Sequence, residues 1–193
     1  PNVKETYTLD GLGIIPQKGD IFKNEFLANT LTKIAEDGRD AYYKGDIART
    51  IANFIKAQGG FLSYEDFASH KSEWVSPVST NYRGYDVWEL PPNGQGITAL
   101  QMLNILEQYD FSKIPFGSEE HIHYFVEAKK LAFEDRARYY ADMAFNKIPV
   151  KELISKEYAN KRRELIDENR AARRYDPGNL EHGETIYLTT ADK

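Results

Sequence analysis

Residues 183–193 read Gly183-Glu184-Thr185-Ile186-Tyr187-Leu188-Thr189-Thr190-Ala191-Asp192-Lys193. β-Branched and aromatic residues dominate this stretch, which is the composition of a β-strand. Residues 155–168 before it are rich in Lys, Arg and Glu, as in a solvent-exposed helix. The change of pattern predicts that a helical region gives way to a strand that begins at Thr185. A threonine at the start of a strand is most often structural, so a catalytic role for Thr185 depends on what precedes it.

Composition restricts the classes of protein that fit. The chain has 193 residues, enough for one domain with a hydrophobic core. The net charge of −5 argues against nucleic acid or an anionic membrane surface as a partner. No apolar run reaches the roughly 20 residues of a membrane span. The chain has no cysteine, which excludes disulfides, thiolate metal sites and a cysteine nucleophile. No signal peptide is visible, and the compartment stays open between cytoplasm, periplasm and extracellular space.

The apolar periodicity predicts a mainly helical chain with a few strands, an α+β fold. Residues 1–19 are expected to be irregular because glycines and Pro16 break the pattern. A β-hairpin is predicted from residues 78–82 and 85–90, joined at Arg83-Gly84. Helices are predicted from an Asp20 cap to Gly38, from Arg39 to Gly59 with a break at Gly45, from the Ser63 capping box, and over residues 97–107, 118–140 and 155–168.

Four of these helices carry apolar stripes that are expected to be buried. Two of the stripes are Ile47, Ile51, Phe54 and Ile55, and Leu100, Leu103, Ile105 and Leu106. In the helix before Gly38, the stripe consists of Phe22, Phe26, Leu27, Leu31 and Ile34. In the helix over 118–140, it consists of Ile122, Phe125, Val126, Ala132 and Phe133.

A glycine-rich loop invites a nucleotide-binding interpretation. Residues 94–99 match the loose pattern G-x-G-x-x-A between a strand and a helix. However, the preceding strand belongs to a hairpin, and no strand ending in an acidic residue follows about 20 residues later. A tight strand-to-helix connection is therefore favoured over a nucleotide site.

The other candidate groups also favour structural roles. His121 and His123 point to different faces of a helix, so no metal site and no cofactor is predicted. Glu127 and Asp135 are two helical turns apart, about 12 Å, which is too far to share a proton. Salt bridges to neighbouring elements are the better prediction for both carboxylates. No Gly-x-Ser-x-Gly motif supports a serine nucleophile.

Five segments carry a common pattern from about Gly19 onward: residues 24–31, 40–48, 60–66, 90–96 and 123–136. Together and in this register, they resemble the γ-glutamyltransferase family. Their order and spacing are similar to the later part of that family's large subunit. The Asn-Gly-Gln-Gly form of the loop at residues 93–96 resembles the acylase-like branch more than the Pro-Ser-Ser-Gly form of classical members.

This resemblance implies an N-terminal nucleophile hydrolase with an αββα sandwich. Residues 1–193 would form a single partial domain, in which residues 1–184 belong to the large subunit and residues 185–193 begin the small one. Thr185 matches the position of the family's catalytic threonine. Ile186 and Tyr187 replace a second threonine and a histidine of classical members, which leaves the nucleophile but changes its surroundings.

The implied chemistry begins with cleavage of the chain itself. The Thr185 hydroxyl would attack the carbonyl of Glu184 and free an α-amine on Thr185. With an ordinary pKa near 8, this amine can serve as general base for the hydroxyl. The hydroxyl would then attack a γ-glutamyl or related amide and form an acyl-enzyme. Hydrolysis and transpeptidation would differ only in the second nucleophile.

The resemblance also implies what this chain needs from elsewhere. The family's substrate-binding arginine and oxyanion-hole glycines fall outside residues 1–193, so the remaining segments of both subunits are the expected partners. The fragment alone is predicted to be inactive. Two alternatives stay open: an acylase for β-lactam side chains, and a non-enzymatic helical interaction or scaffold module, which the change at Ile186-Tyr187 favours.

Overall fold

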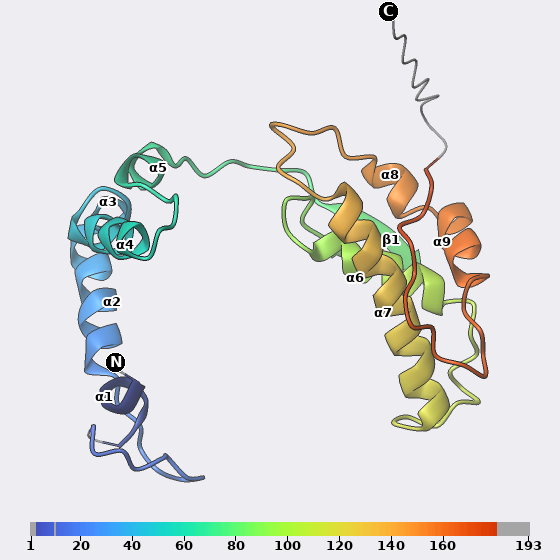
Figure 1. Cartoon of the computed structure of the whole chain (residues 1–193), viewed down its shortest axis with the longest axis horizontal. Coiled ribbons are helices and arrows are strands. Elements are labelled where there is room, and N and C mark those ends of the chain that lie inside the picture. The colour runs from blue at the N-terminus through green and yellow to red at the C-terminus, as the bar shows by residue number, and fades with distance from the viewer. Residues whose placement is uncertain (1–2, 10, 181–193) are drawn as a thin grey trace, which may run out of the picture. The chain divides into compact units, whose positions relative to one another are not determined.

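The computed structural model describes residues 3–9 and 11–180 and divides into two compact units, Pro1–Glu73 and Trp74–Lys193 (Figure 1). Helices dominate both, and the sheet among the described residues has two strands, which confirms the α+β class. The strand predicted from Thr185 lies outside the described residues. The assignment of residues 1–193 to one partial domain stays a prediction.

The regular elements of the first unit are helices, and an isolated antiparallel β-bridge joins Leu9 and Ile14. Its helices are α1 (Val3–Tyr7), α2 (Glu25–Asp37), α3 (Arg39–Tyr43), α4 (Asp46–Ala57) and α5 (Tyr64–Ser69). The short helix α1 lies in the region that was predicted to be irregular.

Two local predictions in this unit are confirmed. The break between α3 and α4 falls at Gly45, where a Cβ would lie 2.5 Å from the carbonyl oxygen of Ala41. The capping box at α5 is present, since Ser63 accepts the Asp66 N–H and the Asp66 carboxylate accepts the Ser63 N–H.

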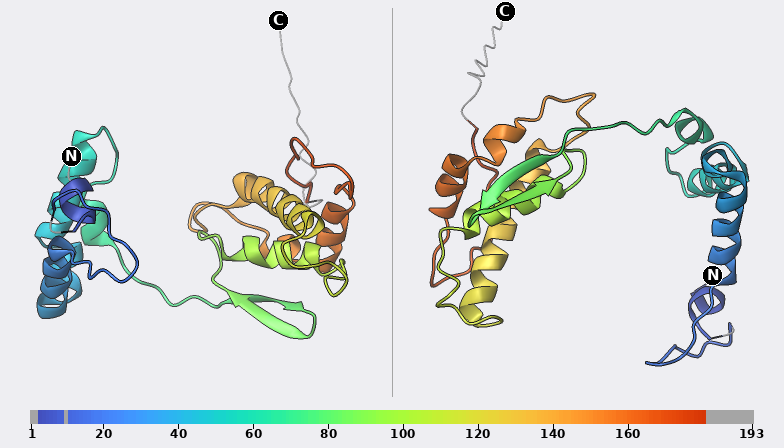
Figure 2. Two further views of the ribbon diagram at one scale, coloured as in Figure 1. Left: turned by 90° about the horizontal axis from the view of Figure 1, so that it is seen from below. Right: turned by 180° about the vertical axis from the view of Figure 1, so that it is seen from behind.

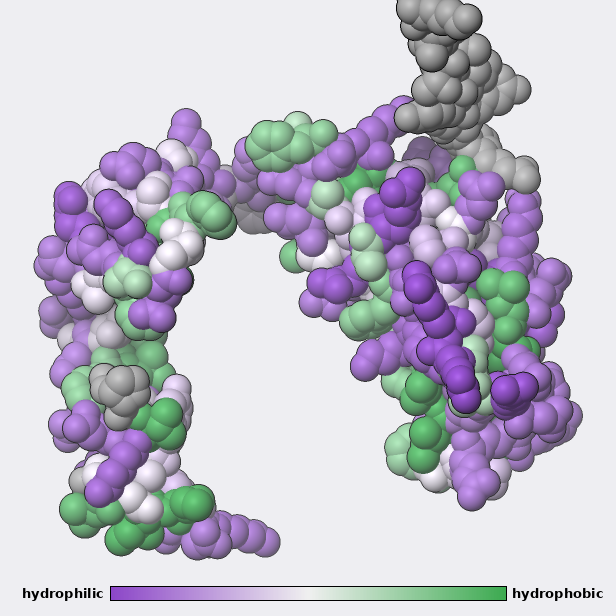
Figure 3. Space-filling view, viewed as in Figure 1, coloured by the Kyte–Doolittle hydropathy of each residue, from purple (hydrophilic) through white to green (hydrophobic). Residues whose placement is uncertain are grey.

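The start and the buried stripe of α2 were predicted wrongly. Asn24 caps the helix by accepting the N–H of Leu27, whereas Asp20 accepts the N–H of Gln17 outside the helix. The side chains of Phe26, Leu27 and Leu31 are 62%, 52% and 55% exposed. Apolar surface is visible on both units in Figure 3.

The second unit is built around α6. The hairpin strands β1 (Val78–Tyr82) and β2 (Tyr85–Glu89) pair antiparallel with Tyr82 opposite Tyr85, as predicted. Helix α6 (Gly96–Leu106) contacts both strands as well as α7 and α9 (Figure 2). The remaining helices are α7 (Glu119–Tyr139), α8 (Val150–Leu153) and α9 (Lys156–Arg163), the last of which ends earlier than predicted. The largest fully buried apolar side chains are Ile97, Leu100, Ile105, Leu131 and Leu153.

The glycine-rich loop makes the tight connection that was favoured. A Cβ at Gly96 would lie 2.7 Å from Oε2 of Glu89 and 2.9 Å from the carbonyl oxygen of Leu90. Glycine therefore lets the first turn of α6 pack directly against the end of β2.

A polar cluster joins the hairpin, α6 and α9. Thr80 donates to Oδ1 of Asn104 at 2.6 Å, and the Asn104 amide donates to the carbonyl of Ile154 at 2.6 Å. The Lys156 ammonium group reaches Oδ1 of Asn104 at 2.7 Å and also pairs with Glu107. These contacts fix the hairpin on the helices.

Helix α7 buries a different face from the one predicted. Ile122, Phe125 and Val126 are 54%, 48% and 41% exposed, and only Ala132 of the predicted stripe is buried. The buried residues are Tyr124, Glu127, Ala128, Leu131, Ala132 and Asp135. The prediction failed because Glu127 and Asp135 are buried and have partners inside the unit. A prediction based on apolar residues places charged side chains such as these on the surface. Among the described residues, none of the helices has the length and apolarity needed to cross a bilayer.

Candidate functional site

The predicted site residues Glu184 and Thr185 lie outside the described residues. The description ends at Leu180, four positions before Glu184. The site is therefore built from residues 172–180, here called the approach segment, and from the helices that hold it.

The first anchor of the approach segment is Asp135 on α7, whose side chain is fully buried. Its Oδ1 atom accepts the N–H of Gly178 at 2.8 Å and lies 3.1 Å from a guanidinium nitrogen of Arg162. Its Oδ2 atom accepts from the Gln101 amide at 3.0 Å. The predicted salt bridge to a neighbouring element is confirmed, and it includes a backbone contact that the sequence did not indicate.

The protonation of Asp135 reflects two opposing effects. Burial raises the pKa of its carboxyl group, while the Gly178 N–H and the Arg162 guanidinium lower it, and the net direction is upward. Arg162 is itself buried and also donates to the carbonyl of Leu131 at 3.1 Å. The charged pair thus lies inside the unit, and its hydrogen bonds reach the Gly178 N–H, the Leu131 carbonyl and the Gln101 side chain.

The second anchor is Glu127, two turns earlier on α7 and 1% exposed. Its Oε2 atom accepts the Tyr175 hydroxyl at 2.6 Å and the N–H of Ala172 at 3.2 Å. Its other oxygen pairs with Lys130 on the same helix, so the predicted salt bridge to a neighbouring element is wrong for Glu127. Lys130 also donates to the carbonyl of Ala172 at 2.7 Å. Burial acts to raise the pKa of Glu127, but the contacts with Lys130, Tyr175 and Ala172 outweigh burial and lower it.

Gly178 is held at both its backbone groups. Its N–H binds Asp135, and its carbonyl accepts the Tyr139 hydroxyl at 2.5 Å. A Cβ at this position would lie 2.0 Å from the Tyr158 hydroxyl oxygen and 3.0 Å from Cδ of Arg162. The sequence predicted only a loop around Gly178. The one feature of the sequence that pointed to these anchors was the pair of carboxylates on α7, Glu127 and Asp135, eight residues apart.

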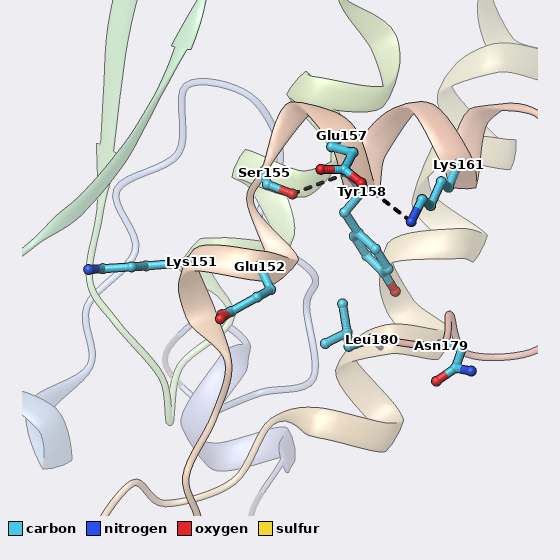
Figure 4. A pocket seen from close by; sticks show the side chains of 8 residues that line it. All are labelled: Lys151, Glu152, Ser155, Glu157, Tyr158, Lys161, Asn179 and Leu180. Atoms are coloured by element: carbon cyan, nitrogen blue, oxygen red, sulfur yellow. Dashed lines mark hydrogen bonds and ion pairs between the residues drawn. The ribbon is translucent and has the colours of Figure 1, made fainter. Parts of the chain in front are cut away.

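An open pocket of about 390 Å³ lies beside the end of the approach segment (Figure 4). Lysines and carboxylates both line it, and a Glu157–Lys161 ion pair of 3.4 Å crosses one side. Leu180 packs against the apolar cluster that contains Leu100 and Leu153. The pocket residues are Lys151, Glu152, Ser155, Glu157, Tyr158, Lys161, Asn179 and Leu180.

The two histidines of α7 contact different surroundings. His123 Nε2 lies 2.8 Å from the carbonyl oxygen of Asp167, and the His121 ring lies 4.9 Å from the Phe116 ring, centroid to centroid. The structure does not bring them together at one point.

Comparison with known proteins gives a consistent result. A family model described as gamma-glutamyltranspeptidase matches residues 1–193. The chain is 43% identical over 166 residues to the glutathione hydrolase-like YwrD proenzyme of Bacillus subtilis (strain 168), covering 86% of this chain and 31% of that protein.

Two solved structures have similar folds. The gamma-glutamyltranspeptidase of Helicobacter pylori has a TM-score of 0.69 and 33% identity, over 94% of this chain and 53% of that one. The cephalosporin acylase of Bacillus halodurans has a TM-score of 0.64 and 38% identity, over 86% of this chain and 31% of that one. The chain spans about a third of the length of the curated relatives it matches.

Proposed function

Because the chain belongs to the gamma-glutamyltranspeptidase family, we propose that the full-length protein is an N-terminal threonine hydrolase or acyltransferase for γ-glutamyl or related amides. The observation that carries the proposal is the family match over all 193 residues, which includes the junction at Thr185. The relatives' names supply the reaction class, glutathione hydrolase or acylase.

Maturation is proposed to begin at the bond between Glu184 and Thr185. The Thr185 hydroxyl attacks the Glu184 carbonyl, the C–N bond breaks, and an ester C–O bond forms. Water then hydrolyses the ester, which leaves a carboxylate on Glu184 and a free α-amine on Thr185. The word proenzyme in the names of the relatives supports such a cleavage.

The mature site then uses the two groups of Thr185 together. The α-amine takes the hydroxyl proton as the oxygen attacks the substrate amide, and it returns a proton to the leaving amine. The acyl group remains on Thr185 as an ester until water or an acceptor amine releases it. No cofactor enters either step.

The acyl specificity divides into two candidates. A γ-glutamyl group is favoured by the hydrolase and transpeptidase relatives. An acylase acting on β-lactam side chains is the second candidate, because the chain is 38% identical to a cephalosporin acylase and carries the Asn-Gly-Gln-Gly loop.

The proposal is tested on purified full-length protein. Mass spectrometry should find two polypeptides, the second of which begins at Thr185, and γ-glutamyl anilide should be hydrolysed. The Thr185→Ala variant should remain one inactive chain. Parallel assays with a cephalosporin amide separate the acylase candidate. A folded, intact and inactive wild-type protein would instead support the scaffold alternative.

A further inference from the structure

We propose that Asn93 is a site of spontaneous deamidation, at which the backbone nitrogen of Gly94 displaces ammonia from the Asn93 side chain. Asn93 and Gly94 form the single Asn-Gly pair of the chain, and they open the glycine-rich loop for which no nucleotide site was favoured. The inference concerns neither Thr185 nor its substrate, so it stands apart from the proposed function.

The reaction is an intramolecular acyl transfer. The Gly94 amide nitrogen attacks Cγ of Asn93, the bond from Cγ to the side-chain nitrogen breaks, and that nitrogen leaves as ammonia with the proton from Gly94. The product is a succinimide ring. Water opens the ring at one carbonyl to give aspartate, or at the other to give isoaspartate, in which the main chain runs through the former side chain. The rate depends on how readily the two neighbouring groups can align.

The structure leaves room for this alignment at residues 93 and 94. Both residues are exposed and lie outside helices and strands. A Cβ at Gly94 would meet nothing within 4 Å, so the ring has space beside the backbone. Glycine also gives the attacking peptide group more conformational freedom than another residue would.

Hydrogen bonding does not restrain the reacting groups. Within the part of the chain that the structure describes, no hydrogen bond holds the Gly94 N–H or the Asn93 side-chain amide. Other asparagines are held: Asn24 Oδ1 accepts the Leu27 N–H at 2.9 Å, and the Asn104 amide donates to the Ile154 carbonyl at 2.6 Å. Attack at those asparagines requires a hydrogen bond to break first, whereas attack at Asn93 does not.

Three further asparagines provide an internal comparison. Asn146, Asn169 and Asn179 are exposed and lie outside helices and strands, as Asn93 does. They are followed by lysine, arginine and leucine, whose side chains hinder the approach of the backbone nitrogen. The following glycine therefore distinguishes Asn93 from asparagines of similar exposure.

The isoaspartate product would alter the connection between β2 and α6. Its main chain is longer by one carbon atom, in a loop whose end is closely packed, since a Cβ at Gly96 would lie 2.7 Å from Oε2 of Glu89. Helix α6 contacts both strands of the hairpin as well as α7 and α9. We therefore expect the modification to lower the stability of the second unit.

The test follows the full-length protein during incubation at mildly alkaline pH, where the attacking nitrogen loses its proton more readily. Digestion with pepsin in acid limits further deamidation. Chromatography and mass spectrometry then separate peptides with asparagine, aspartate or isoaspartate at position 93. We expect Asn93 to convert at least about tenfold faster than Asn146, Asn169 or Asn179. A parallel incubation in urea gives the rate for the unfolded chain.

Two variants isolate the reacting groups. Gly94→Ala adds a methyl group that meets no neighbour in the structure, and it should slow the conversion by about tenfold. Asn93→Gln moves the side-chain carbonyl one carbon atom further from the Gly94 nitrogen and should abolish the modification at this position. After the same incubation, the melting temperature should fall in the wild type and stay unchanged in Asn93→Gln.

The outcomes are distinguishable. Selective conversion of Asn93 in the folded wild type, slowed in Gly94→Ala, supports the proposal. Conversion of Asn93 no faster than that of the other three asparagines overturns it. Conversion confined to the protein in urea also overturns it, because the folded loop would then keep the two groups apart. Conversion without a fall in melting temperature refutes the effect on the second unit. The state of the Glu184–Thr185 bond enters none of these measurements.

Discussion

At the scale of single residues, Gly178 is the described glycine at which an added Cβ would meet the closest neighbouring atom. Its backbone is bonded on both sides, and the space where a side chain would begin is occupied by the Tyr158 hydroxyl and the Arg162 side chain. The requirement for glycine here comes from close packing, not from an unusual backbone angle, since Gly178 is not among the glycines with positive φ.

Gly178→Ala should therefore destabilise the second unit by about 1–3 kcal/mol, because the new methyl group forces Tyr158 or the approach segment to move. Urea denaturation followed by circular dichroism measures the change. Gly94→Ala is the matched control, because a Cβ there meets nothing within 4 Å, and its stability should remain near that of the wild type. Equal stability of the two variants would contradict the packing argument.

Arg162 is the second residue whose loss should be costly. Arg162→Met leaves the Asp135 carboxylate buried without its cation, which should cost about 3–5 kcal/mol in unfolding free energy. Lys161→Met, on the adjacent position, breaks only the exposed pair with Glu157 and should change stability by less than about 1 kcal/mol. Urea denaturation measures the unfolding free energy of both variants. Similar losses of unfolding free energy would mean that burial does not make the Asp135–Arg162 pair more important than an exposed pair.

At the scale of elements, α7 differs from an ordinary amphipathic helix. Its buried face contains two carboxylates, and its apolar residues Ile122, Phe125 and Val126 remain substantially exposed. The helix therefore supplies hydrogen-bond acceptors for the approach segment as well as part of the hydrophobic core of the second unit.

The Glu127 anchor should weaken in acid. Its pKa is lowered in the folded state from an ordinary value of 4.5, so its contribution is present above that pH and is lost as the pH falls through the lowered value. The difference in urea midpoint between wild type and Glu127→Gln should be largest at neutral pH and shrink below pH 4.5. A difference that grew in acid would refute the sign of the effect.

The capping box of α5 makes a local prediction for the first unit. Ser63→Ala removes the hydroxyl that accepts the Asp66 N–H and should destabilise the helix by about 1 kcal/mol. Hydrogen exchange of the α5 amides, read by mass spectrometry, should become faster. Ser69→Ala, at the last position of α5, serves as the control and should leave the exchange of the first turn unchanged.

Some of these elements could be predicted from the sequence alone, and others could not. The hairpin and the Ser63 cap follow from local chemistry within a few residues, so they could be predicted. The buried face of α7 could not, because the position of Glu127 and Asp135 depends on Tyr175, Arg162 and Gly178, which are far away in the chain. Likewise, nothing local distinguishes the Asn24 cap of α2 from the Asp20 cap that was predicted.

At the scale of the whole molecule, the family resemblance implies that the proposed nucleophile and the groups that bind its substrate belong to different segments. The chain spans about a third of the length of the curated relatives, and the predicted Thr185 has no described environment within it. The assignment of Thr185 rests on the family resemblance and stays a prediction, whereas the anchors of the approach segment became visible only in three dimensions.

Residues 1–193 in isolation should therefore not turn over γ-glutamyl anilide above the rate of a protein-free blank. The reason is that the groups expected to bind substrate and stabilise the oxyanion lie outside this range. The assay uses the full-length protein as positive control. Steady turnover by the isolated chain, abolished by Thr185→Ala, would show that the essential groups are all present within it.

The anchors of the approach segment join residues that are distant in the chain: Asp135 and Gly178 are 43 positions apart, and Glu127 and Tyr175 are 48 apart. Contacts of such separation cost more loop-closure entropy than local contacts, since the ends of a long loop must be brought together. The approach segment binds carboxylates on α7, and Asp135 among them is also bonded to α6 and α9, so docking of the segment depends on all three helices. A chain in which these helices fail to pack together would therefore leave the approach segment undocked.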